Sequence, residues 1–176
     1  MKIICLGDSI TAAANGWVSI LDQNRGIWIN AGIPGDTALG MAARLQNQIL
    51  ANRPDGVFLL AGINDILLTG SDGTARSAVM AMVHQCVRMG VKPIVGIPYR
   101  PVRVPSYLQP ICHPDWPGAM EVYIDWLREL CRALHLRHVD FARVMGPELL
   151  TDGLHPSPEG HRIMAEEVIQ SCGRSL

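Results

Sequence analysis

The sequence lacks a charge imbalance, a paired set of cysteines and a long hydrophobic run. Its 15 Lys and Arg residues nearly balance 16 Asp and Glu residues, which leaves a net charge of −1. A polyanion would find no extended positive surface, so the composition argues against a dedicated nucleic-acid-binding protein. No apolar run approaches the ~18 residues of a membrane-spanning helix, so we expect no membrane span.

The five cysteines form no CxxC pair, and their number is odd. These features argue against a closed disulfide framework and against a zinc ribbon. The N-terminal apolar run, residues 3–6, is too short for the core of a signal peptide. Free thiols are typical of a reducing compartment, so we expect a cytoplasmic location.

Short apolar runs alternate with helical patterns along all 176 residues, which predicts one domain over residues 1–176. The expected strands cover residues 3–7, 27–30, 57–61, 93–97 and 138–141. The expected helices cover residues 12–23, 37–51, 74–89, 118–136 and 158–172. Strands separated by helices of about ten or more residues favour parallel pairing. The prediction is therefore an α/β fold, a three-layer α/β/α sandwich around a five-stranded parallel sheet.

One irregular stretch, residues 98–118, contains six of the twelve prolines. It also carries Tyr99, Tyr107 and Trp116, whose rings combine apolar surface with a polar group. A loop of this length is often a lid or a binding loop, which makes these three side chains candidates for substrate binding. A proline-stiffened connection is an equally good interpretation.

The carboxyl ends of parallel strands form the edge at which such sheets bind ligands. The first strand delivers Ser9 to this edge, and the segment after the fifth strand delivers Asp152 and His155. Serine is a poor nucleophile without a base, and an imidazole needs a partner that fixes its tautomer. These three residues therefore form a candidate catalytic triad. Gly35, Asn64 and the backbone N–H of Ser9 are the candidate oxyanion donors.

Each of these features has a plainer interpretation when it is taken alone. Serine after a strand often caps a helix, and glycine or asparagine often occupies a turn. Asp140 competes with Asp152 for the acidic role, and Gly32 competes with Gly35. The stretch 112–115 contains Cys, His and Asp but no fourth ligand at a known spacing, so we expect no metal. The plain interpretations would all have to be true at once at several strand ends. That coincidence is less probable than a shared catalytic role, so we favour the catalytic interpretation.

Four short blocks resemble those of the GDSL-type esterases, also called SGNH hydrolases. They are GDSIT at 7–11, NAGIPGDT at 30–37, GIND at 62–65 and DGLH at 152–155, in the order typical of the family. The resemblance implies a flavodoxin-like sheet of order 2-1-3-4-5. It also implies catalytic roles for Ser9, Gly35, Asn64 and His155, with Asp152 completing the triad.

The activity implied by the resemblance is hydrolysis of small or medium acyl esters or thioesters through an acyl-enzyme, without metal or cofactor. The expected partner is a small-molecule acyl ester. The alternative is a catalytically inactive flavodoxin-like module that binds a ligand or another protein. The sequence carries neither GxxxxGK[ST] nor GxGxxG after the first strand, which disfavours a nucleotide-binding version of that alternative.

Overall fold

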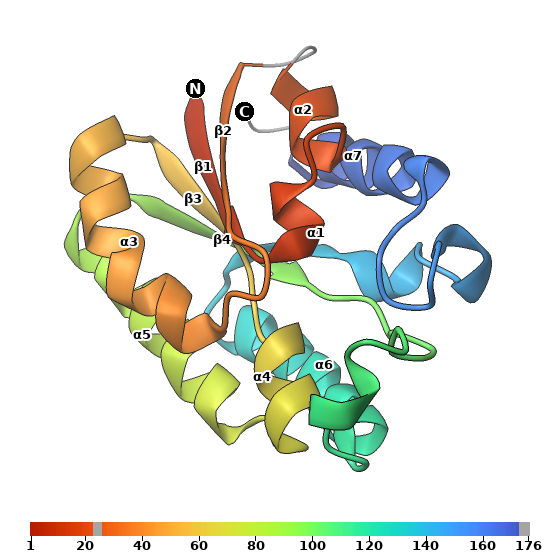
Figure 1. The fold of residues 1–176 in the computed structure, drawn as a ribbon. Helices are drawn as coiled ribbons and strands as arrows, with labels where there is room; N and C mark the ends of the chain where they lie inside the picture. The colour runs from red at the N-terminus through yellow and green to blue at the C-terminus, as the bar shows by residue number, and fades with distance from the viewer. Residues whose placement is uncertain (23–25, 173–176) are drawn as a thin grey trace.

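The structure is a computed structural model that describes residues 1–22 and 26–172. Its centre is a five-stranded parallel sheet of order β2-β1-β3-β4-β5, which confirms the expected order (Figure 1). The strands are β1 (Lys2–Gly7), β2 (Ile27–Gly32), β3 (Gly56–Leu60), β4 (Lys92–Ile97) and β5 (Arg137–Asp140). The burial of all five β3 residues fits a central strand covered on both faces.

Helices cover both faces of the sheet, as the three-layer prediction requires (Figure 1). One layer consists of α1 (Ser9–Ala12), α2 (Trp17–Asp22) and α7 (Pro158–Cys172). The other consists of α3 (Ala38–Asn52), α5 (Gly73–Arg88) and α6 (Trp116–Ala133). A short helix, α4 (Ile63–Thr69), follows β3 and contacts α5 and α6.

Two helices begin at side-chain caps near the carboxyl edge of the sheet. Thr37 Oγ1 accepts a hydrogen bond from Gly40 N–H at 3.2 Å, and Ser157 Oγ accepts one from Gly160 N–H at 3.1 Å. These contacts satisfy backbone donors that the first turn of a helix leaves unpaired. The expected starts of the helices at 37–51 and 158–172 are confirmed to within one residue.

The first predicted helix, residues 12–23, is wrong in its extent. The structure has two shorter helices, α1 and α2, separated by a turn in which Gly16 N–H donates to Ala13 C=O at 2.9 Å. Asp8 caps α1, so the chain enters a helix directly after β1. The last residue of the predicted range, Gln23, lies outside the described residues.

The irregular segment is shorter than expected. Its last residues already belong to α6, which starts at Trp116 with Pro117 in its first turn, where a missing N–H costs nothing. A 3-10 turn covers Gln109–Ile111. None of the helices within the described ranges has the length and apolar character needed to cross a membrane.

Candidate active site

Three side chains from the two ends of the chain meet at the carboxyl edge of the sheet. Ser9 Oγ lies 3.1 Å from His155 Nε2, and His155 Nδ1 lies 2.8 Å from Asp152 Oδ2. When Nδ1–H donates to the carboxylate, Nε2 is free to accept the hydroxyl proton. The structure thus brings the three candidate triad residues together in one relay.

The carboxylate of Asp152 also organises its own loop. Its Oδ1 accepts the backbone N–H groups of Leu154 at 2.9 Å and of His155 at 2.7 Å. Burial alone would raise the pKa of Asp152, but the hydrogen bonds from His155 and Leu154 outweigh burial and lower it. Asp152 therefore stays ionised and can stabilise a positive charge on the imidazole.

Asn64 stands in the first turn of α4, and a single contact fixes its amide. Asn64 Nδ2 donates to the Asp36 carbonyl at 2.9 Å, and its second N–H has no acceptor among residues 1–22 and 26–172. The backbone N–H groups of Gly35 and Ser9 have no hydrogen-bond acceptor in the described part of the chain. The competing Gly32 already donates its N–H to Asn30 Oδ1 at 2.9 Å. This difference favours Gly35 over Gly32 as an oxyanion donor.

The position of α4 depends on residues that the sequence patterns did not single out. Gly62 precedes the helix with φ of 106°, and any Cβ there would collide with the Tyr123 ring. The Tyr123 hydroxyl donates to Ala61 C=O at 3.0 Å, and Asp65 Oδ2 accepts Ala38 N–H at 2.8 Å. The first contact joins the residues that lead into α4 to α6, and the second joins α4 to the start of α3. No periodicity predicts them, because their partners are distant in sequence.

Asp8 is a second carboxyl group beside the relay. It is 2% exposed, and its Oδ1 accepts Ile10 N–H at 3.0 Å. Burial raises the pKa of Asp8 to about 6, although the Ile10 N–H and the charge of His155 act in the opposite direction. Asp8 can therefore change its charge in mildly acidic solution, close to the reacting groups.

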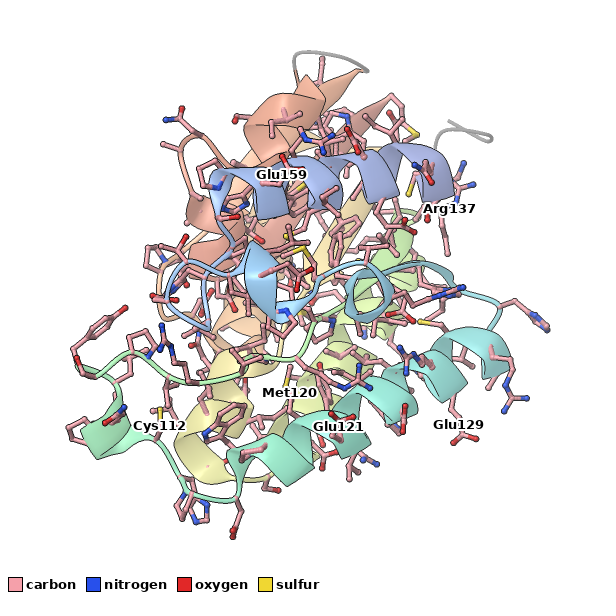
Figure 2. The ribbon with its side chains drawn as sticks, turned by 90° about the vertical axis from the view of Figure 1, so that its right-hand side faces the viewer. Cys112, Met120, Glu121, Glu129, Arg137 and Glu159 are labelled. Carbon is pink, nitrogen blue, oxygen red and sulfur yellow. The ribbon has the colours of Figure 1, made fainter. Side chains whose placement is uncertain are left out.

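A small pocket opens beside the candidate oxyanion donors Gly35 and Asn64. Its volume is ≈ 120 Å³, and its remaining wall consists of Leu67, Leu68, Leu108, Ile111 and Cys112. Figure 2 shows Cys112 on the segment that approaches α6, at the opposite end of the view from Arg137, where β5 begins. The pocket therefore belongs to the carboxyl edge and is predominantly apolar.

The three candidate substrate-binding side chains have different surroundings. Tyr99 is fully buried, and its hydroxyl donates to Leu154 C=O at 2.7 Å. This corrects the expectation that Tyr99 offers its ring to a substrate. Tyr107 is 68% exposed, whereas Trp116 is half-buried against the core at the start of α6. Only Tyr107 presents most of its ring to solvent.

The alternatives for the acidic group and for a metal find no support in the geometry. Asp140 pairs with Arg128, whose Nε donates to Asp140 Oδ2 at 2.8 Å. In the stretch around Cys112, His113 Nδ1 accepts the backbone N–H of Asp115 at 3.2 Å, and the Asp115 carboxylate lies 3.8 Å from that nitrogen. Across residues 1–22 and 26–172, no three His, Cys, Asp or Glu side chains are grouped so that they could hold a metal.

Known proteins resemble this chain over most of its length. The sequence profile of the GDSL-like lipase/acylhydrolase family matches residues 5–163. An acetylxylan esterase of Geobacillus stearothermophilus is 25% identical over 192 residues, covering 96% of this chain and 82% of that protein.

Two solved structures share the fold. A GDSL-like lipase from Bacteroides thetaiotaomicron superposes with a TM-score of 0.85 at 23% identity, covering 99% of this chain and 89% of that one. A lipase/acylhydrolase from Enterococcus faecalis gives a TM-score of 0.79 at 26% identity, covering 98% and 96%. The chain belongs to the GDSL-like lipase/acylhydrolase family and is a carboxylic ester hydrolase of the GDSL/SGNH type.

Proposed function

We propose that the protein hydrolyses small or medium acyl esters through an acyl-enzyme on Ser9. The observation that carries the proposal is the relay from Ser9 Oγ to His155 Nε2 at 3.1 Å and from His155 Nδ1 to Asp152 at 2.8 Å. A serine in hydrogen-bond reach of an imidazole that a carboxylate orients is the arrangement required for nucleophilic catalysis. An inactive binding module would have no need for such a relay.

In the first half-reaction, Ser9 Oγ attacks the ester carbonyl while His155 Nε2 takes its proton. The oxyanion accepts hydrogen bonds from the free N–H of Asn64 and from the backbone N–H groups of Gly35 and Ser9. The imidazolium, stabilised by Asp152, then gives its proton to the departing alcohol, and the acyl group remains on Ser9. A water molecule repeats these steps and releases the carboxylic acid.

The pocket beside Gly35 and Asn64 supports the proposed size of the acyl group. Its volume of ≈ 120 Å³ has room for several carbon atoms and none for a long chain buried along its whole length. Because its outer wall includes Leu68 and Ile111, which are 44% and 58% exposed, a longer chain would extend into solvent. Acetyl esters also belong among the candidates, since one relative is called an acetylxylan esterase.

The proposal is tested by measuring the hydrolysis rates of p-nitrophenyl esters from acetate to palmitate. Rapid-mixing kinetics are then recorded with the best of these substrates. We expect a burst of nitrophenol equivalent to one active site for the best short or medium ester, and no change with EDTA. A requirement for a divalent cation, or hydrolysis confined to long chains, would contradict the proposal.

The five cysteines are all free, which supports our further proposal of a cytoplasmic location.

A further inference from the structure

The segment after β4 follows the catalytic loop closely. In both views the green segment that leaves β4 lies beside the blue loop that precedes α7 (Figures 1 and 2). The Tyr99 hydroxyl donates to Leu154 C=O at 2.7 Å, and the Val102 N–H donates to Gly153 C=O at 2.9 Å. Arg103 donates its Nε–H to Asp152 C=O at 3.1 Å. Residues 99–103 therefore engage three consecutive carbonyl groups of the 152–155 loop.

We propose that Tyr99, Val102 and Arg103 form a strap that holds His155 in line with Ser9. The inference rests on the proposed function, because it assigns the strap to the same relay. Tyr99 and Arg103 act as positioning residues, since their contacts are with the loop backbone.

The strap is attached to a rigid part of the molecule. Tyr99 comes two residues after β4, and both Pro98 and Pro101 are buried beside it. Proline fixes φ and restricts the residue before it, so this stretch has few alternative conformations. Ser9 follows β1 in the same sheet. The strap therefore fixes the position of His155 relative to the sheet, and the same sheet positions Ser9.

The backbone conformation of the 152–155 loop allows the strap to approach it closely. Gly153 has φ of 89°, which L side chains rarely adopt, and a Cβ there would collide with the Arg103 side chain. The glycine thus lets Arg103 lie directly against the loop backbone. Inside the loop, Asp152 already binds two backbone N–H groups and the imidazole. The inner contacts fix the shape of the loop, and the strap fixes where that shape lies.

Because the inner contacts and the strap contacts have different roles, loss of a strap contact should have a specific effect on the kinetics. Removing a strap contact shifts the whole loop, so Ser9 Oγ and His155 Nε2 lose alignment while the Asp152–His155 contact persists. A misplacement of about 1 Å costs roughly 10²-fold in rate. We therefore expect kcat per active site to fall about 10- to 100-fold in Tyr99→Phe, with KM and the pH midpoint of kcat/KM nearly unchanged.

The experiment compares wild type, Tyr99→Phe, Arg103→Ala and Arg100→Ala. Arg100 is the matched control, because its guanidinium pairs with Glu121 on α6 instead of with the catalytic loop. Active sites are counted by complete labelling with an organophosphate, and kcat is expressed per labelled site well below the melting temperature. We expect a decrease of about three- to tenfold in Arg103→Ala and none in Arg100→Ala.

A purely structural role for the strap would lower the fraction of labelled protein and leave kcat per labelled site unchanged. That result, or rates within about twofold of wild type in both strap variants, would overturn the inference. If Tyr99→Phe does not fold, the comparison of Arg103→Ala with Arg100→Ala decides, since both side chains are exposed or partly exposed. Wild-type protein that is neither active nor labelled at Ser9 would instead refute the proposed function.

Discussion

Replacing Asn64 with alanine separates catalysis from stability. Asn64 Nδ2 donates one N–H to the Asp36 carbonyl, and we propose that it donates the other to the oxyanion. Loss of one oxyanion donor costs about 2.7–4 kcal/mol in the transition state, or roughly 10²–10³ in kcat. Loss of the Asp36 contact costs only about 1 kcal/mol of folding free energy. For a protein of this size that lowers Tm by about 2–4 °C.

The assay measures kcat and KM on the best p-nitrophenyl ester together with Tm. Asn52→Ala is the matched control, because Asn52 Nδ2 also donates to one backbone carbonyl, that of Gln48, at the far end of α3. We expect comparable shifts in Tm and a loss of kcat only in Asn64→Ala. A kcat within about threefold of wild type would show that Asn64 donates no hydrogen bond to the oxyanion. A raised KM with unchanged kcat would instead make Asn64 a ground-state binding residue.

Three further predictions test neighbouring parts of the site. Asp152→Ala should lower kcat by about 10²–10⁴, because the imidazole loses its orienting acceptor; stopped assays on folded protein check this, and near-normal turnover would remove Asp152 from the relay. The pKa of Asp8 is about 6 in the folded protein, against an ordinary value of 3.8, so the folded protein binds the Asp8 proton more tightly than the unfolded chain does. The free energy of unfolding therefore falls as pH rises from 4 to 6. Asp8→Asn keeps an acceptor for Ile10 N–H and should raise the free energy of unfolding at pH 8 by up to about 3 kcal/mol with little change at pH 4, measured by urea titration; equal effects at both pH values would contradict the assignment. Leu68→Trp should fill the apolar pocket and lower kcat/KM for butyrate and longer esters about tenfold relative to acetate, whereas an unchanged ranking would exclude the pocket as the acyl site.

The sequence predicts the sheet well because the strands carry the strongest patterns. Apolar runs such as Val57–Leu60 are buried on both faces, so composition alone identifies them. The starts of α3 and α7 follow equally from Thr37 and Ser157, whose caps are local. The helix α4 escaped prediction because it is seven residues long, and its position depends on Tyr123 and Ala38, which are remote in sequence.

The sequence predicts which residues form the candidate site, but it does not predict the contacts that hold the catalytic loop in place. Short blocks around Ser9 and His155 indicate the chemistry, since the residues of each block are neighbours in sequence. The sequence favours Tyr99 as a substrate-binding residue because its ring combines apolar surface with a polar group in a candidate binding loop. The structure buries it against a carbonyl 55 positions away, a pairing that only the folded chain can reveal.

Labelling with an organophosphate followed by peptide mapping identifies the nucleophile. If Ser9 is the nucleophile, we expect one adduct per chain, located on the peptide that contains Ser9, with activity lost in proportion to labelling. We also expect no adduct and no ester hydrolysis in folded Ser9→Ala protein. An adduct on another residue that abolishes activity, or hydrolysis by Ser9→Ala above a few per cent of wild type, would show that Ser9 is not the nucleophile.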